Sequence, residues 1–360
     1  MSCTPQKISF MFEVAERCNQ RCTFCYNAWR PEGAPGKKQL STAQALKVLE
    51  RVIDESPCHS IALSGGEPLL RKDIFDLISF IKKTGKKACL VTNGLLLSKK
   101  NIDRCLSAGV DAFQITLLSH QAERHNRMTG VDGFGGVFDA IHGVKRAGGK
   151  VQVSFVALAG NIEDFKGVLE LSVLVGVDSV SFGRFLPGGA GLAGWQELLP
   201  SPEAIERALE TAEEFGRKYR VSISVTNPLP PCLHDISKYR HVRFGFCGVG
   251  REDHALLAID PEGNLKVCSH SPVVLGNLLE KSFAEIIENP FLEEFDRAVP
   301  DFCRDCAELA ACRGGCRSSA QVCYGSVGCQ DPYVALWKTR ARKPTHSLAE
   351  QLGMRCEELP

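Results

Sequence analysis

The cysteines of this chain gather mainly in two spaced groups, and this distribution limits the possible folds more than any other feature. Three of the seventeen cysteines, Cys18, Cys22 and Cys25, form a C-x3-C-x2-C pattern. A second group lies in the last third of the chain. Because the sequence carries no secretion signal, we do not expect disulfides. Such spacing is instead typical of proteins that bind a metal or an iron–sulfur cluster.

Composition and charge narrow the class of protein. Hydrophobic residues make up 44% and charged residues 24% of the 360 residues, which is typical of globular proteins and excludes a disordered or fibrous chain. The formal net charge is only +1, so nucleic acid is not expected as a partner. No apolar run is long enough for a membrane span or a signal peptide, so we expect no membrane partner and a cytoplasmic location.

Short apolar runs alternate with amphipathic segments in the first two thirds of the chain. The apolar runs predict strands that are covered on both faces. Repeated βαβ units of this kind predict an α/β fold, a partial (β/α)6 barrel similar to a TIM barrel, with its chemistry at the C-terminal ends of the strands. The predicted strands are 8–14, 60–63, 88–92, 112–117, 151–157 and 179–182, and the predicted helices are 41–55, 74–84, 101–108, 134–147 and 162–175.

The sequence changes in character after the barrel. Ser201 and Pro202 are typical of a helix start, and this helix should reach about Tyr219. Three prolines then interrupt the chain, and short strands around a turn at 261–264 precede the cysteine-rich end. We therefore expect a barrel domain over residues 1–226, a small cysteine-rich α+β domain over 227–345 and a C-terminal tail over 346–360.

The first cysteine group directly follows the first predicted strand, and Phe24 precedes its last cysteine. Three thiolates on a tight loop can hold three irons of a four-iron cluster and leave the fourth iron free. Zinc is the alternative, but it usually takes four protein ligands in two pairs. The loop resembles the signature of the radical S-adenosylmethionine (SAM) superfamily, which has this spacing and an aromatic residue before the third cysteine. The resemblance implies a 4Fe-4S cluster that binds SAM.

Further motifs follow in the order of that superfamily. Gly65, Gly66, Glu67 and Pro68 resemble its GGEP motif, which implies that backbone groups and Glu67 receive the methionine amine of SAM. In isolation this segment would be an ordinary turn, as would the Asn93 turn after the third strand. The resemblance implies further SAM contacts from polar residues that could equally be solvated loop residues: Thr116, Ser119, Arg127 and Asn161.

The second cysteine group also matches a known pattern. Seven cysteines and Gly263 have the order and intervals of the SPASM extension of radical SAM peptide maturases, which carries two auxiliary 4Fe-4S clusters. By this resemblance an outer cluster has the ligands Cys303, Cys306, Cys312 and Cys329, and an inner cluster has the ligands Cys247, Cys268 and Cys316.

The resemblance leaves one ligand of each auxiliary cluster undecided. The fourth ligand of the inner cluster is Cys232, a non-cysteine group, or an open iron that could hold substrate. Cys323 competes with Cys329 at the outer cluster, and Cys329 is favoured because residues 330–337 predict a terminal helix. The cysteines outside both ligand sets are expected to be small buried apolar residues: Cys3, Cys58, Cys89, Cys105, Cys232, Cys323 and Cys356.

One glycine pattern suggests a different ligand. Gly189, Gly191 and Gly194 fit G-x-G-x-x-G, the pattern of dinucleotide-binding loops. The segment follows a proline and is not expected to open a helix. A dinucleotide site is therefore not expected.

The resemblance also implies a reaction. SAM is cleaved reductively to methionine and a 5′-deoxyadenosyl radical, which abstracts a hydrogen atom from the substrate, and the auxiliary clusters assist. SPASM enzymes most often modify a peptide or protein side chain by crosslinking, thioether formation or oxidation, and this is our main expectation. The alternatives are radical oxidation or decarboxylation of a small molecule such as a tetrapyrrole side chain, and a non-catalytic iron–sulfur electron carrier.

The resemblance also implies protein partners and bears on which reaction of the family is expected. A reductase such as flavodoxin or ferredoxin would supply the electron. Cys18 lies so early that we expect no leader-binding domain before the barrel, so a leader peptide would need a separate binding protein. Ser269 and His270 follow Cys268, where sulfatase-maturing relatives commonly have Asp, and this argues against formylglycine formation.

Overall fold

The computed structural model describes residues 6–27, 38–249, 254–339 and 341–342. Its centre is an eleven-stranded sheet in the order β11-β10-β9-β1-β2-β3-β4-β5-β6-β7-β8. Strands β1 to β8 pair in parallel, β9 also runs parallel to β1, and β10 is antiparallel to both β9 and β11. The strands are β1 (Lys7–Ala15), β2 (Cys58–Gly65), β3 (Lys87–Thr92), β4 (Ala112–Thr116), β5 (Val151–Ala157), β6 (Ser179–Arg184), β7 (Ser222–Val225), β8 (Val242–Phe244), β9 (His254–Ile259), β10 (Asn264–Lys266) and β11 (Gly276–Asn277).

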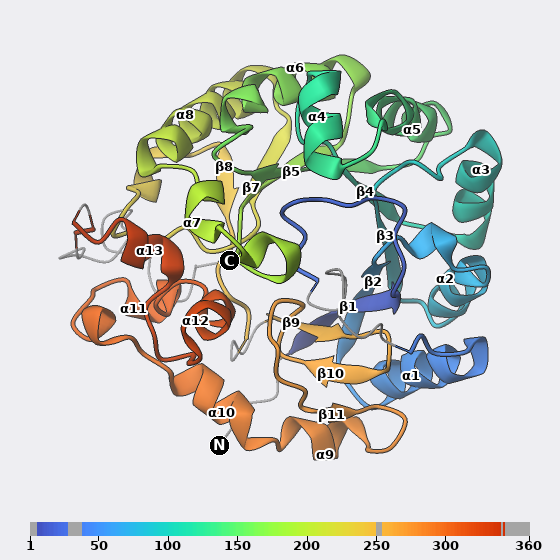
Figure 1. The fold of residues 1–360 in the computed structure, drawn as a ribbon. Coiled ribbons are helices and arrows are strands. Elements are labelled where there is room, and N and C mark those ends of the chain that lie inside the picture. Colours follow the sequence, from blue (N-terminus) through green and yellow to red (C-terminus); the bar gives the residue numbers. More distant parts are fainter. Residues whose placement is uncertain (1–5, 28–37, 250–253, 340, 343–360) are drawn as a thin grey trace.

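The larger helices form an outer layer around the curved sheet (Figure 1). This arrangement confirms the predicted α/β fold with a partial TIM-like barrel. The helices are α1 (Thr42–Asp54), α2 (Ile74–Lys83), α3 (Lys99–Ala108), α4 (Ala122–Thr129), α5 (Phe134–Arg146), α6 (Phe165–Val175), α7 (Trp195–Leu198), α8 (Pro202–Tyr219), α9 (Phe283–Ile287), α10 (Pro290–Arg297), α11 (Leu309–Cys312), α12 (Arg317–Tyr324) and α13 (Pro332–Leu336).

The expectation that the barrel strands are covered on both faces is wrong for β5, whereas parts of β1 and β6 are buried on both faces. In β5, buried residues such as Val153 and Phe155 alternate with the partly exposed Gln152 and Ser154. The buried residues belong to the core beneath the helices. The other face carries polar pairs between strands, such as Gln152 Nε2 to Ser179 Oγ at 3.3 Å. In β5 only one face packs against helices, so its other face contributes to a polar concave surface.

Side-chain caps explain where several helices begin. Ser201 and Pro202 start α8 as predicted, and the Ser201 side chain accepts a hydrogen bond from the backbone N–H of Ala204. Helix α3 begins two residues earlier than predicted, because Ser98 caps it. Helix α4 was missed, because only His125 and Thr129 are buried along it and leave little apolar periodicity.

The sheet continues beyond residue 225 on both sides of the barrel. Strand β8 pairs with β7 at one edge, and β9 pairs with β1 at the other. The predicted turn at 261–264 is confirmed as the connection between β9 and β10. There the Asp260 carboxylate accepts hydrogen bonds from the backbone N–H groups of Glu262 (2.9 Å) and Asn264 (3.0 Å). The cysteine-rich region therefore extends the sheet and contributes strands next to β1.

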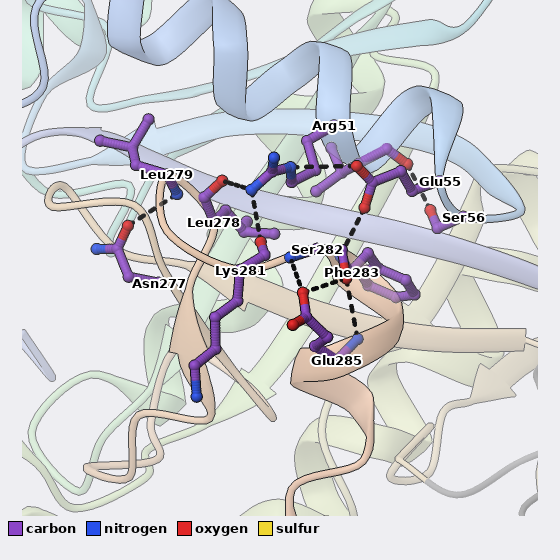
Figure 2. A network of polar contacts seen from close by, with 11 residues as sticks. Arg51, Glu55, Ser56, Asn277, Leu278, Leu279, Lys281, Ser282, Phe283 and Glu285 are labelled. Atoms are coloured by element: carbon purple, nitrogen blue, oxygen red, sulfur yellow. Dashed lines mark hydrogen bonds and ion pairs between the residues drawn. The ribbon is translucent and has the colours of Figure 1, made fainter.

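A polar network fastens this region to helix α1 (Figure 2). Arg51 Nη1 donates to the carbonyl oxygens of Leu278 (2.8 Å) and Lys281 (2.6 Å), and Arg51 Nε lies 3.1 Å from Glu55 Oε1. The other oxygen of Glu55 accepts from the backbone N–H of Phe283 at 2.6 Å. The network fixes the start of α9 against the barrel.

Among the helices of the described residues, none is both long and apolar enough to cross a membrane.

Candidate functional site

The first three cysteines lie on a loop at the C-terminal end of β1, which we call the cysteine loop (residues 16–27). The end of β2 holds this loop by backbone pairing. The N–H of Gly66 donates to the carbonyl of Ala15 at 2.6 Å, and the N–H of Glu67 donates to that of Arg17 at 2.8 Å. The predicted GGEP segment thus continues the sheet along the start of the cysteine loop.

The two glycines of this segment are required by close packing. A Cβ at Gly66 would lie 2.1 Å from the carbonyl oxygen of Arg17, and one at Gly65 would lie 2.3 Å from that of Ala15. Gly65 also has a φ of +123°, which other residues rarely adopt. Any side chain here would push the cysteine loop away from β2.

Glu67 is a buried hub beneath the cysteine loop. Its Oε1 accepts hydrogen bonds from the Leu69 N–H (3.1 Å) and the Thr92 hydroxyl (2.8 Å), and its Oε2 accepts one from the Asn93 N–H (2.8 Å). Burial raises the pKa of Glu67 to about 7. The carboxylate therefore ties the ends of β2 and β3 together.

Asn93 links Glu67 to the cysteine loop by its side-chain contacts. Its Nδ2 donates to Asn19 Oδ1 at 2.7 Å and lies 3.7 Å from Cys18 Sγ. On another side, the carbonyls of Met128 and Thr129 at the end of α4 accept the N–H groups of Thr23 (3.1 Å) and Arg21 (2.8 Å). Hydrogen bonds from several elements thus fix the cysteine loop.

The glycine segment after β6 also packs on the cysteine loop. Gly191 N–H donates to Cys25 O at 3.4 Å, and a Cβ at Gly189 would lie 2.5 Å from the same oxygen. The expectation that this segment opens no helix was wrong in detail, since the four-residue helix α7 begins at Trp195 with Gly194 as its cap. The glycines here permit close packing against the third cysteine.

The remaining predicted SAM contacts lie in different surroundings. Thr116 ends β4 and is partly exposed. Ser119 is buried, and its hydroxyl donates to Asp164 Oδ2 at 2.5 Å. Asn161 is also buried, and its amide donates to the carbonyls of Leu118 (2.8 Å) and Val156 (3.0 Å).

Arg127, Phe24 and Pro68 are the other three residues that are predicted to contact SAM. Arg127 has a largely exposed side chain that lies 3.6 Å from Glu123, so it points to the surface of α4. Phe24 is partly buried against the core, and Pro68 begins a short 3-10 helix. Ser119 and Asn161 shape the strand ends, whereas Arg127 forms an ion pair with Glu123 of its own helix.

A buried polar cluster beside the cysteine loop was missed. Glu13 on β1 is fully buried, and Tyr26 Oη donates to its Oε1 at 3.3 Å. Burial raises the pKa of Glu13 to about 8, and the nearby Lys266 opposes this rise. The Tyr26 ring stacks on His270, with centroids 4.4 Å apart. A lone Glu inside an otherwise apolar strand was the available signal.

The Tyr26–His270 stack joins the two cysteine regions. Tyr26 directly follows Cys25, and His270 lies two residues after Cys268. The first cysteine group therefore lies close to the inner auxiliary group.

The inner group is brought together by the start of α12. Three consecutive residues each contact one cysteine sulfur. Arg317 Nη2 lies 3.5 Å from Cys247 Sγ, Ser318 Oγ lies 3.1 Å from Cys268 Sγ, and Ser319 Oγ donates to Cys316 Sγ at 3.2 Å. Burial raises the pKa of Cys316 to about 12 and that of Cys268 as well. These thiols therefore stay neutral unless a metal compensates the thiolate charge.

A tight turn separates the inner from the outer group. Arg313, Gly314 and Gly315 all have positive φ values of 56°, 81° and 86°. This turn reverses the chain between Cys312 and Cys316, so the two cysteines of the C-x3-C pattern serve different groups.

The outer group lines a cavity. Cys303, Cys306 and Cys312 all contribute to its wall, and so does Cys232. Burial raises the pKa of Cys232 to about 12, with a further contribution from the nearby Cys303 and Cys306. The placement of Cys232 beside the outer group was not foreseen.

The other cysteines have mixed environments. Cys58 and Cys105 are buried in the hydrophobic core, while Cys89, Cys323 and Cys329 are partly exposed. Cys3 and Cys356 lie outside the described residues, as does the predicted tail over 346–360.

The donors present fit iron–sulfur clusters. Cysteine thiolates are the usual ligands of such clusters, and cubane clusters take three or four of them. The cysteine loop offers three thiols on a prearranged backbone, and the second region offers two further sets. The hydrogen bond between Ser318 and Cys268 and the one from Ser319 to Cys316 are contacts of the kind that would tune cluster-bound thiolates.

Comparisons with known proteins agree with this chemistry. Residues 12–172 match the profile of the Radical SAM superfamily, and residues 247–307 match that of SPASM, an iron-sulfur cluster-binding domain. The chain therefore carries a Radical SAM domain and a SPASM domain, and it is an enzyme whose cofactors are SAM and iron–sulfur clusters.

Matches to individual proteins cover most of the chain. It is 26% identical over 359 residues to PqqA peptide cyclase of Granulibacter bethesdensis, a match covering 98% of this chain and 91% of the relative. Its fold is similar to that of Streptococcus suis SuiB bound to the precursor peptide SuiA, with a TM-score of 0.73, 14% identity, and 92% and 76% of the two chains covered. It is also similar to anSMEcpe with bound AdoMet, with a TM-score of 0.72, 19% identity, and 92% and 95% covered.

Proposed function

We propose that this enzyme modifies a side chain of a peptide or protein by radical chemistry. The observation that carries the proposal is the cysteine loop, held at the C-terminal ends of β1, β2 and β3 beside a polar concave surface. When bound there, a 4Fe-4S cluster and SAM supply a 5′-deoxyadenosyl radical that abstracts a substrate hydrogen.

The residues of the chain have distinct proposed roles. Cys18, Cys22 and Cys25 hold the first cluster. Gly65 and Gly66 let the GGEP segment approach the cysteine loop, and Glu67 and Asn93 fix the loop. The Glu67 carboxylate accepts three hydrogen bonds and keeps a further acceptor position, with which it would receive the methionine amine of SAM. Thr116 is the candidate among the later residues with an accessible side chain. Ser119 and Asn161 position the strand ends.

The peptide substrate is supported by similarity over nearly the whole chain to PqqA peptide cyclase. The concave face offers matching chemistry, since polar side chains such as Ser60, Gln114 and Ser154 line it. Such groups can hydrogen-bond a peptide backbone.

We also propose how the chain is divided into domains and which proteins it works with. We assign the barrel to residues 1–226 and the auxiliary region, with two further 4Fe-4S clusters, to residues 227–345. A flavodoxin or ferredoxin would supply the electron in the cytoplasm, and a separate protein would present a leader peptide. Co-purification under anaerobic conditions tests both partners.

The reaction itself can be tested with the full chain. Anaerobically reconstituted protein should form 5′-deoxyadenosine from SAM in the presence of dithionite. Cys18→Ala should abolish this product, while Cys89→Ser, at a cysteine outside the proposed ligand sets, should retain it. No deoxyadenosine from the loaded wild type would contradict the proposed reaction.

The substrate class needs a separate measurement. Deuterium transfer from a labelled peptide into deoxyadenosine, with a mass change in the peptide, would support peptide modification. Turnover of a tetrapyrrole, with no change in any candidate peptide, would contradict it.

A further inference from the structure

Cys232 lies in a turn between β7 and β8 and lines the same cavity as three cysteines of the outer group. We propose that Cys232, rather than Cys329, is the fourth ligand of the outer auxiliary cluster. This inference rests on the proposed function, because it requires that the second region binds iron–sulfur clusters. It assigns to Cys232 a ligand role in a different cluster from the inner one considered above.

The cavity has the donors that a fully coordinated cluster needs. Four cysteines line it, Cys232 from the turn after β7 and Cys303, Cys306 and Cys312 from the cysteine-rich region, and four thiolates is the ligand number of a 4Fe-4S cluster held by protein alone. Among the described residues that line the cavity, the segment near the C-terminal end contributes Gln330 and Val334 and not Cys329.

The rest of the cavity wall is mainly apolar. Pro230, Phe302 and Leu309 lie between the cysteines. An apolar shell limits water access to a cluster and favours its retention. By contrast, Cys58 and Cys105 are embedded in the hydrophobic core.

The turn that carries Cys232 is fixed in place. The backbone N–H groups of Leu233 (3.0 Å) and His234 (3.2 Å) donate to the carbonyl of Pro230. His234 Nε2 lies 3.0 Å from Tyr333 Oη of α13, and their rings stack. These contacts hold Cys232 beside the outer cysteines, and a ligand that is fixed in this way lowers the entropy cost of metal binding.

The assignment has a functional consequence. A cluster with four cysteine ligands has no open iron, so the outer cluster cannot coordinate substrate and is left with electron transfer. Any open iron for substrate would then belong to the inner cluster, where three cysteines converge.

Iron content of the full chain tests the assignment. Wild type, Cys232→Ala, Cys232→Ser, Cys329→Ala and the control Cys89→Ser are purified anaerobically, and iron and sulfide are measured per chain. Cys232→Ala should lose about four irons relative to wild type, while Cys329→Ala and Cys89→Ser keep the full complement. Cys232→Ser should retain iron, because serine oxygen can replace the thiolate, but with a changed electron paramagnetic resonance spectrum.

Two outcomes would overturn the assignment: full iron content in Cys232→Ala, or an equal loss in Cys329→Ala. Circular dichroism and the retained iron of Cys232→Ser separate ligand loss from misfolding. If wild type itself binds no iron, the proposed function fails, whereas a loaded wild type with a loaded Cys232→Ala refutes only this inference.

Discussion

Replacement of Glu67 by Ala tests whether this carboxylate fixes the cysteine loop. The side chain is fully buried and accepts hydrogen bonds from two backbone N–H groups and one hydroxyl. The substitution leaves these donors buried without an acceptor. It should also release Asn93, whose side chain reaches Asn19 and Cys18.

The expected cost follows from these three contacts. A buried donor that loses its partner costs about 1–3 kcal/mol, so Glu67→Ala should lower the free energy of unfolding by about 4 kcal/mol. Glu67→Gln keeps one oxygen but places an NH2 group opposite another donor, so it should cost about half as much. Both losses are large beside a typical stability of about 5–15 kcal/mol.

Denaturant unfolding of the anaerobically purified chain, together with its iron content, measures the effect. The control is Glu123→Ala, at a surface residue whose side chain is 92% exposed and which should change stability by less than about 0.5 kcal/mol. The reasoning is refuted if Glu67→Ala is as stable as this control and retains all its iron.

Four further substitutions have expected outcomes. Burial raises the pKa of Glu13 from 4.5 to about 8. Between these two pH values the folded chain keeps a proton that the unfolded chain releases. The free energy of unfolding of the wild type therefore falls as the pH rises from 4.5 to about 8. Glu13→Gln lacks this titration, so its free energy of unfolding relative to that of the wild type should rise by up to about 5 kcal/mol between about pH 5 and pH 9, as measured by denaturant unfolding. Parallel pH profiles of the two proteins would contradict this reasoning. Arg51→Ala removes two hydrogen bonds to the segment before α9, so amides of α9 should exchange about tenfold faster or more, while unchanged exchange would exclude a docking role. Ser318→Ala and Ser319→Ala should each lower the reduction potential of the inner cluster by about 40 mV, or about 1 kcal/mol, in a redox titration, and an unshifted potential would show that these hydroxyls do not tune it.

The fold was largely predictable because its signals are local. Apolar runs and caps such as Ser201 act within a few residues, and they located all six predicted strands. The polar alternation within β5 was also visible in the sequence, but it was read as a strand covered on both faces. Helix α4 was missed because its composition carries little periodicity.

The candidate site was predictable where spacing alone defines chemistry. The three cysteines of the first loop and the glycines of the GGEP segment are in this class. The roles of the polar residues were not, because Glu67 and Asn161 could equally have faced a ligand. Their hydrogen bonds to backbone groups of neighbouring strand ends appear only when the strands are assembled.

By itself the sequence determined the class of chemistry, since thiols at these intervals on a short loop leave few alternatives to an iron–sulfur cluster. Only the tertiary structure decided which distant groups meet. Arg184 and Asp331 form a buried ion pair although they are 147 residues apart, and Cys232 reaches cysteines more than seventy residues later. The physical reason is that spacing fixes geometry only within a turn or loop, whereas contacts between segments depend on how the sheet and its covering helices pack.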